Sequence, residues 1–284
     1  KPFNRSVLQA RLKKQLEKKQ DLHPLSDALG ENNVTKALKL CDELLDARNR
    51  NTAELLKLKC ELLIELQEYQ QADALCLQVL KQRPLPWAQF LRGKIHLLQN
   101  NFEQAEPILK KVLQENVNFI SAYDCLSECQ HQLGKHDEAQ QTLLNALEIS
   151  PKSVVRQRAM ADTAELNGDL SLAEKSRRKA VRTGKNSVLR QASDFTKLAE
   201  TQVQNSNAKE ALRTIEKMKS EFKEDKQARL AASLTKSKIC HKLNDEKAAA
   251  AATEEAVKLF EQAPNLVSNE LATELTQACL KQGN

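Results

Sequence analysis

Residues 120–151 read ISAYDCLSECQHQLGKHDEAQQTLLNALEISP. Apolar residues follow helical spacing on both sides of Gly134, and Ala139 comes early in the second half. A small residue at this point lets two helices approach closely, because a larger side chain would force them apart. Gly134 supplies the left-handed turn between them. The stretch therefore predicts a pair of antiparallel helices.

The same pattern recurs along the chain. Equivalent alanines follow one another at intervals of 35, 33, 34, 34, 38 and 38 residues, namely Ala37, Ala72, Ala105, Ala139, Ala173, Ala211 and Ala249. This period resembles the tetratricopeptide repeat (TPR). The middle copies carry the resemblance best, through Gly93, Phe102, Leu113, Tyr123, Leu126, Gly134, Ala146, Leu147 and Pro151. The resemblance implies an all-α fold, namely a right-handed superhelical solenoid of antiparallel helix pairs with about seven repeats and a terminal helix.

The alanine register sets the expected repeat boundaries. The units run over residues 18–52, 53–85, 86–119, 120–153, 154–190, 191–229 and 230–266. Residues 268–283 resemble one more first helix. The two 38-residue intervals predict about four extra residues near 187–191 and again near 221–227.

Composition fits this architecture. Aromatic residues make up 4% of the chain and charged residues 29%, with 6 Gly and 7 Pro, as in an all-helical protein with short loops. No stretch approaches the roughly 18 apolar residues of a membrane span. The seven cysteines form no CxxC pair, which indicates a reducing compartment and predicts a cytoplasmic protein.

Charge is distributed unevenly. Residues 1–20 carry a net charge of +6, residues 21–150 carry −6, and residues 151–190 carry +6. An acidic front half and a basic middle do not describe a generally basic surface for nucleic acid.

The first twenty residues form a basic amphipathic pattern, with Leu8, Leu12 and Leu16 on one face. Taken alone, it could be an interaction tail, a membrane-surface helix or the end of a preceding domain. Lys1-Pro2-Phe3 and the leucines that follow resemble the end of a response-regulator receiver domain. That resemblance implies that residues 1–20 are the receiver's last helix and that Lys1 contacts a phosphorylated aspartate. The chain is then a fragment, and residues 21–284 form the TPR array.

In TPR proteins the concave groove, lined by first helices, binds the partner. Alignment on the alanines places in that groove Lys57, Glu61, Trp87, Phe90, Lys94, Asp124, Glu128, His131, Arg158, Asp162 and Glu165. Trp87 and Phe90 are the expected anchors, because an aromatic ring offers a large apolar area at small entropic cost. Alternatively, Trp87 covers the preceding proline turn. The acids favour a basic or amphipathic peptide or protein segment.

A basic cluster lies on a second helix, which faces the convex side in this architecture. It consists of Lys175, Arg177, Arg178, Lys179, Arg182 and Lys185. A solvated face is the simplest interpretation. An acidic protein partner is the functional alternative, and RNA is disfavoured because no aromatic residues alternate with these charges.

The sequence contains no catalytic set, since phosphate-binding loops, nucleophile elbows and metalloprotease helices are all missing. Cys125 and Cys129, near His131 and His136, could be drawn as a metal site, but both cysteines fit the apolar stripe of their helix. We therefore expect no metal and no cofactor.

The leading hypothesis is a noncatalytic protein-interaction scaffold that serves as the output region of a bacterial two-component response regulator. A stand-alone adaptor for a pilus, secretion or envelope complex is the alternative, and nucleic-acid binding through the basic middle repeats is a minor one. A homodimer is compatible with both the output-region and the adaptor hypothesis, because terminal repeats can self-associate.

Overall fold

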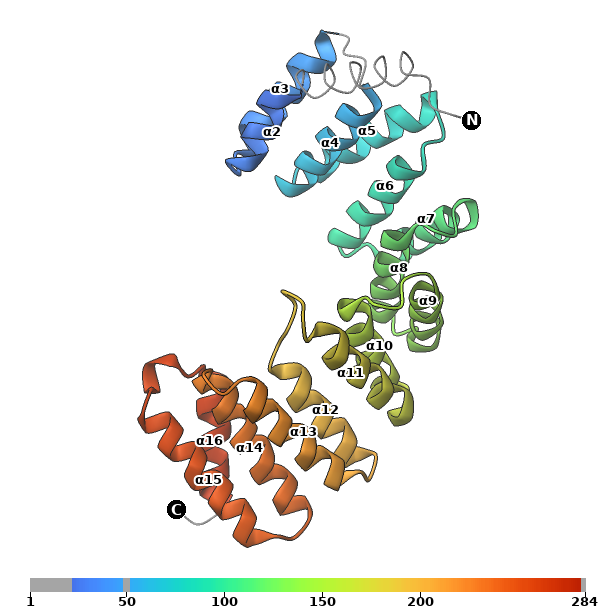
Figure 1. Cartoon of the computed structure of the whole chain (residues 1–284). Coiled ribbons are helices and arrows are strands. Elements are labelled where there is room, and N and C mark those ends of the chain that lie inside the picture. Colours follow the sequence, from blue (N-terminus) through green and yellow to red (C-terminus); the bar gives the residue numbers. More distant parts are fainter. Residues whose placement is uncertain (1–21, 48–51, 282–284) are drawn as a thin grey trace, which may run out of the picture. The chain divides into compact units, whose positions relative to one another are not determined.

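The computed structural model describes residues 22–47 and 52–281 (Figure 1). Over these ranges the chain forms α-helices and one short 3-10 turn, and they contain no strand. The helices are α2 (His23–Gly30), α3 (Val34–Asp46), α4 (Thr52–Glu65), α5 (Tyr69–Gln82), α6 (Pro86–Leu98), α7 (Phe102–Glu115), α8 (Ile120–Gln132), α9 (His136–Ile149), α10 (Val154–Leu166), α11 (Leu170–Gly184), α12 (Ser193–Gln204), α13 (Ala208–Glu221), α14 (Lys226–Lys242), α15 (Glu246–Glu261) and α16 (Asn269–Lys281). This order confirms the predicted all-α fold, with seven successive pairs from α2 to α15 and a terminal helix.

The repeat alanines lie at the contact between the two helices of each pair. All seven repeat alanines are fully buried, at 0% exposure. Each lies on the second helix of its pair, one turn after the helix begins. Burial at every copy shows that small side chains at this position permit the close helix packing that the repeat needs.

The turns between paired helices follow the predicted chemistry. Asn100, Gly134 and Gly168 adopt positive φ angles of 61°, 71° and 75°, the left-handed conformation that ends a helix. Asp169 then caps α11 by accepting a hydrogen bond from the Leu172 amide at 2.9 Å. The chain thus reverses direction within a few residues and brings the second helix back along the first.

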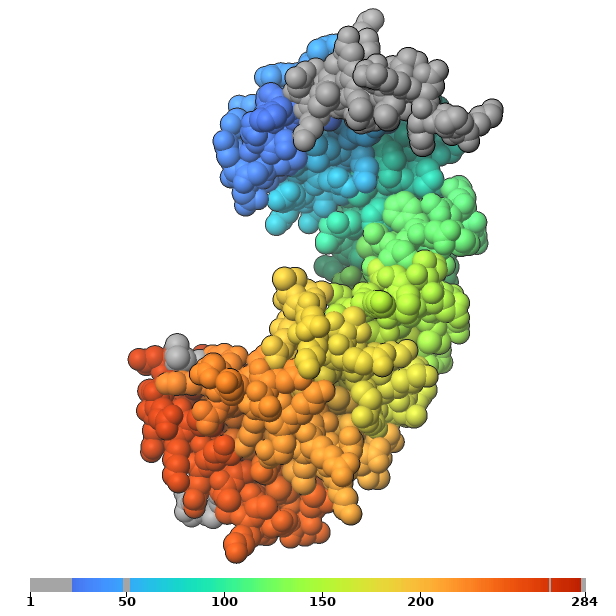
Figure 2. Space-filling model, in the orientation of Figure 1, coloured from blue at the N-terminus to red at the C-terminus, as the bar shows by residue number. Residues whose placement is uncertain are grey.

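The described structure comprises two compact units, which meet in sequence between Gly134 and Lys135. In the first unit, α4 contacts α6, and α6 contacts α8. In the second, α12 contacts α14, and α14 contacts α16. Within each unit, we call the surface formed by the first helices of the pairs the first-helix layer, which in the second unit includes α16, and the surface formed by the second helices the second-helix layer. Figure 2 shows neighbouring segments of each unit packed side by side.

The extra residues expected near 187–191 form the loop 185–192, which joins α11 to α12. Two arginines hold this loop. Arg158 donates a hydrogen bond to the Leu189 carbonyl oxygen at 2.6 Å, and Arg190 donates one to the Glu221 carbonyl oxygen at 2.8 Å. Arg190 also lies over the Phe222 ring, 4.4 Å from its centroid. The insertion is therefore anchored to both neighbouring pairs.

Two predictions are refined or left open by the structure. The second insertion lengthens α14, which begins at Lys226 and not at the expected boundary of 230. The basic segment 1–20, with Lys1, lies outside the described residues. Within the described ranges, no helix is both long enough and apolar enough to cross a membrane.

Candidate binding surfaces

Several predicted groove residues of the first unit lie on the first-helix layer with exposed side chains. Lys57 and Glu61 form an ion pair of 3.6 Å along α4, and both side chains are about half exposed (48% and 45%). Lys94 on α6 is partly exposed, and Glu128 on α8 is exposed. Because α4, α6 and α8 are in contact, these charges share one layer. Asp124 and His131 are partly buried on α8.

The two expected aromatic anchors are part of the packing. The Phe90 ring lies 4.8 Å from that of Phe119, between centroids, and Phe90 contacts the apolar clusters on both sides of α6. Trp87 is half-buried against the cluster that includes Leu85. Phe90 therefore joins two successive helix pairs while its side chain stays partly exposed, and its role as an anchor stays a prediction. For Trp87, the anchor role and the alternative of a ring covering the preceding turn both stay predictions.

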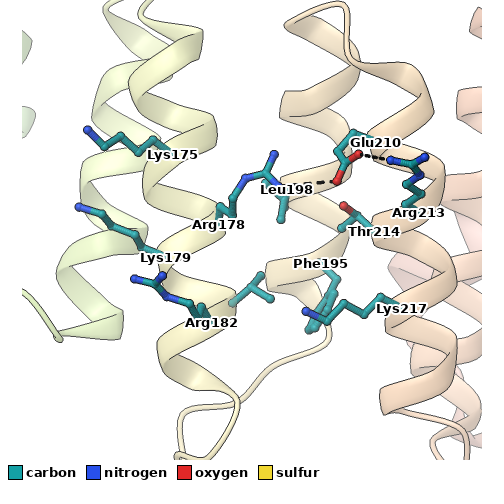
Figure 3. A pocket seen from close by; sticks show the side chains of 11 residues that line it. Lys175, Arg178, Lys179, Arg182, Phe195, Leu198, Glu210, Arg213, Thr214 and Lys217 are labelled. Carbon is teal, nitrogen blue, oxygen red and sulfur yellow. Dashed lines mark hydrogen bonds and ion pairs between the residues drawn. The ribbon is translucent and has the colours of Figure 1, made fainter.

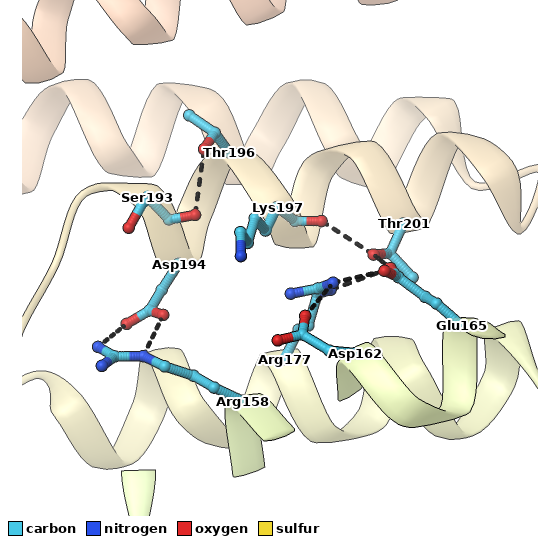
Figure 4. Close-up of polar contacts among 9 residues, drawn as sticks. All are labelled: Arg158, Asp162, Glu165, Arg177, Ser193, Asp194, Thr196, Lys197 and Thr201. Carbon is cyan, nitrogen blue, oxygen red and sulfur yellow. Dashed lines mark hydrogen bonds and ion pairs between the residues drawn. The ribbon is translucent and has the colours of Figure 1, made fainter. Parts of the chain in front are cut away.

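In the second unit, Arg158 is held by a carboxylate of the next pair. Its Nε and one terminal nitrogen donate to the two oxygens of Asp194 at 2.7 and 2.8 Å (Figure 4). The Asp194 side chain is 7% exposed, so the pair is largely shielded from water. A two-point arginine–carboxylate contact fixes orientation as well as charge. Hydrogen bonding to Asp194 raises the pKa of the guanidinium despite partial burial.

Arg177 pairs with Asp162 and Glu165, the two acids predicted for the groove in the second unit. From α11 it donates to both oxygens of Glu165 at 3.1 and 2.6 Å and to Asp162 at 3.0 Å (Figure 4). Its side chain is only 7% exposed. The assignment of Arg177 to an exposed basic patch is therefore wrong. The cause is its place on the helix, four residues after the buried Ala173 and three before the buried Ala180.

This network changes the charge that the second unit offers to a ligand. Burial raises the pKa of Glu165, but hydrogen bonds from Arg177 and Thr201 outweigh it and hold that pKa below its usual value. Glu165 is thus ionised and already paired. Asp162 and Glu165 do not form an unpaired acidic surface, so they supply no argument for a basic ligand.

A second polar cluster, around Glu174, was not predicted from the sequence. The Glu174 carboxylate, on α11, accepts hydrogen bonds from Arg178 at 2.6 Å, Asn205 at 2.8 Å and Asn207 at 3.2 Å. Burial opposes ionisation of Glu174, yet these donors hold its pKa below the usual value. The two asparagines lie in the turn that follows α12, so only the packing of neighbouring pairs reveals their role.

The first-helix layer of the second unit is hollowed between consecutive helices. A cleft of about 230 Å³ lies between the exposed edges of α12 and α14 and is lined by residues that include Glu200, Val203, Lys238 and Lys242. A cleft of about 390 Å³ lies between α14 and α16, and its lining again includes Lys238 and Lys242. The groove residues predicted from the repeat alanines end at Glu165. When the same positions are counted back from Ala211 and Ala249, they fall on Glu200, Val203 and Lys238, so the sequence also contains the signal for these clefts.

On the second-helix layer, the remaining members of the basic cluster lie on or just after α11. Lys175, Arg178, Arg182 and Lys185 are exposed and Lys179 is partly exposed. The Lys185 Nζ atom lies 3.9 Å from a carboxylate oxygen of Glu221, which is a long distance for an ion pair. This surface therefore keeps most of the positive charge that the sequence predicted there.

The cysteines behave as core residues. Cys129 donates its thiol hydrogen to the Phe102 carbonyl oxygen, with sulfur and oxygen 3.1 Å apart, and burial raises the pKa of Cys125 to about 11. A protonated thiol is a poor metal ligand. Within the described ranges, no group of three or more His, Cys, Asp or Glu side chains is arranged to hold a metal ion.

Comparison with known families gives one match. Residues 96–163 match the model of the tetratricopeptide repeat. This range includes the stretch around Gly134 that predicted the repeat. No curated protein sequence matches the chain.

Solved structures extend the likeness. The C-terminal part of a TPR repeat-containing protein from Cytophaga hutchinsonii has a TM-score of 0.67 at 14% identity, over 89% of this chain and 99% of that one. A TPR protein from Parabacteroides merdae has a TM-score of 0.53 at 16% identity, over 92% and 98%. MamA from Desulfovibrio magneticus RS-1 has 0.50 at 20% identity, over 60% and 96%. At these identities the likeness shows the fold, which is that of a TPR solenoid.

Proposed function

We propose that this chain is a noncatalytic scaffold that binds a protein or peptide segment along its first-helix layer. The observation that carries the proposal is the pair of clefts between α12, α14 and α16. Glu200, Val203 and Lys238 in their linings occupy positions that the TPR resemblance assigns to the groove. A groove between rigid helices binds at small entropic cost, because it is formed before the partner arrives.

The lining of these clefts favours an amphipathic segment. Glu200, Lys238 and Lys242 alternate with Val203 and Ile239 in the cleft between α12 and α14. Lys238 already pairs with Glu274 at 3.0 Å, which leaves Lys242 as the cation best placed to meet a ligand carboxylate. Apolar contacts would provide affinity, while the charges would set orientation and association rate.

The test compares two charge reversals in the full-length natural protein, purified with its bound partners from its own cells. Lys238→Glu with Lys242→Glu should remove partners that the wild-type protein retains. Lys247→Glu with Lys258→Glu changes the charge equally at exposed positions of α15, on the second-helix layer, and should retain them. Identical partner sets for both variants would refute binding along the first-helix layer.

We further propose that the scaffold is the cytoplasmic output region of a bacterial response regulator. The support is the Lys1-Pro2-Phe3 segment and the basic amphipathic pattern after it. A receiver preceding Lys1 would regulate the array by changing how its last helix packs or pairs when the receiver is phosphorylated. Such control is a population shift of an interface and requires no chemistry in the array itself.

This part is tested by treating the full-length protein with a small phosphodonor and measuring affinity for a retained partner. Regulation predicts a change in affinity, because one receiver state must favour the binding-competent arrangement. Equal affinity in both states would favour the stand-alone adaptor. Binding by the first-helix layer would survive that outcome, since the charge reversals test it separately.

A further inference from the structure

A cleft of about 400 Å³ lies on the second-helix layer between α11 and α13, with α12 beneath it (Figure 3). Six of the residues that line it are basic and one is acidic, namely Lys175, Arg178, Lys179, Arg182, Arg213, Lys217 and Glu210. Val181, Phe195 and Leu198 close its floor and are nearly fully buried, at 8%, 2% and 4% exposure. The cleft therefore offers a ligand mainly cationic head groups and the methylene stems that carry them.

Only part of this positive charge is neutralised within the protein. Glu210 lies 3.2 Å from Arg213 and 3.7 Å from Arg178, and Arg178 also pairs with Glu174. In the described part of the chain, Lys175, Lys179 and Arg182 have no ion pair or hydrogen bond to another side chain. Lys217, on the opposite wall, lies 3.9 Å from Glu221.

The spacing of the unpaired cations places them on one face. Lys175, Lys179 and Arg182 follow one another by four and then three residues, so they form a row along α11. In Figure 3 the Lys217 side chain extends from α13 towards α11, whereas the head groups of Lys175, Lys179 and Arg182 lie on the side of α11 away from α13. Like charges at these spacings destabilise a helix slightly. An anion that lies along the row would remove that repulsion.

We propose that this cleft binds an acidic, Asp- and Glu-rich segment of a partner protein. The row of cations along α11 matches an extended chain with successive carboxylates, and Lys217 on α13 adds a further positive charge to the cleft. The aliphatic stems of the lysines and arginines would contact its apolar side chains. The site lies on the layer opposite the proposed groove, so the array can hold two partners independently.

The chemistry of the cleft favours a peptide over nucleic acid. Single-stranded nucleic acids bind by stacking bases on exposed aromatic rings. The one ring that lines the cleft, Phe195, is 2% exposed and lies in the floor.

The experiment measures fluorescence anisotropy of a fluorescein-labelled, Glu- and Asp-rich peptide containing leucine. A Lys-rich peptide of equal length and a single-stranded oligonucleotide are the comparison probes. The wild-type chain should bind the acidic peptide in preference to both, and added salt should weaken binding because exposed charges are screened. Lys175→Glu with Lys179→Glu should weaken it by about tenfold or more, the effect of a few unfavourable charge contacts.

The matched control is Lys247→Glu with Lys258→Glu on α15, which should bind within about twofold of wild type. Lys179→Gln, which removes one charge without reversing it, should give an intermediate loss. Circular dichroism verifies that each variant is folded. Three results would overturn the proposal: no binding by the wild-type chain, equal loss in the α15 control, or tighter binding of the oligonucleotide than of the acidic peptide.

Discussion

Arg177 connects more acidic partners than any other side chain drawn in the network between α10, α11 and α12 (Figure 4). A guanidinium suits this role, because its planar fork can meet two carboxylates and remains charged when buried. The burial of Arg177 could be predicted from helical periodicity, since it lies on the same buried face of α11 as Ala173 and Ala180. Its partners could not be predicted, because Asp162 and Glu165 lie on a different helix whose rotation depends on packing.

Replacing Arg177 by Met should destabilise the protein by about 2 to 3 kcal/mol, because Glu165 would lose its main partner while staying partly buried. Met keeps the apolar stem, which separates lost charge from lost packing. Urea unfolding gives the change in free energy. Arg213→Met, at an 80% exposed side chain, should cost less than about 1 kcal/mol. Equal losses for both variants would show that the Arg177 pairing does not contribute to stability.

Glu165 should make stability depend on pH in a defined direction. Because its pKa is lowered on folding, its contribution is present above the ordinary value of 4.5 and is lost as pH falls through the lower folded value. The difference in unfolding free energy between wild type and Glu165→Gln should therefore shrink as pH falls below about 4.5. A difference that stays constant from neutral to acidic pH would contradict the assigned pairing.

At the scale of elements, each pair depends on how closely its two helices approach. Gly93 shows the limit: a Cβ atom added there would lie 2.8 Å from Cγ and Cδ2 of Leu109 on α7. The turns and the buried alanines followed from the sequence because they depend on small residues at fixed spacing, whereas the start of α14 at Lys226 did not. The pairing of Phe90 with Phe119 did not, because an aromatic on a first helix can face either the groove or the next pair.

Gly93→Ala tests this packing. Alanine favours helix over glycine, yet the clash with Leu109 should outweigh that gain and destabilise the protein by about 1 to 3 kcal/mol. Gly30, near the end of α2, has no atom within 4 Å of the added Cβ. Gly30→Ala should thus be neutral or slightly stabilising. Thermal unfolding of the two variants gives the comparison, and a stable Gly93→Ala protein would refute the close approach.

At the scale of the whole molecule, repeats contact their neighbours along the chain, so surfaces on the two layers can act separately. The sequence predicted which helices form the first-helix layer. It did not show which positions remain free for a ligand, because Arg158 and Arg177 pair with carboxylates that only folding brings near. Charge at an exposed helix position is therefore a weak guide to binding until its intramolecular partners are known.

The most direct test of binding by the first-helix layer is photo-crosslinking in the cells that make the full-length protein. A photoreactive amino acid is placed at Lys242, in the clefts of α14, or at Lys258, on the second-helix layer. Our account predicts a discrete crosslinked partner from position 242 and none from position 258. Crosslinks from position 258 alone would contradict it.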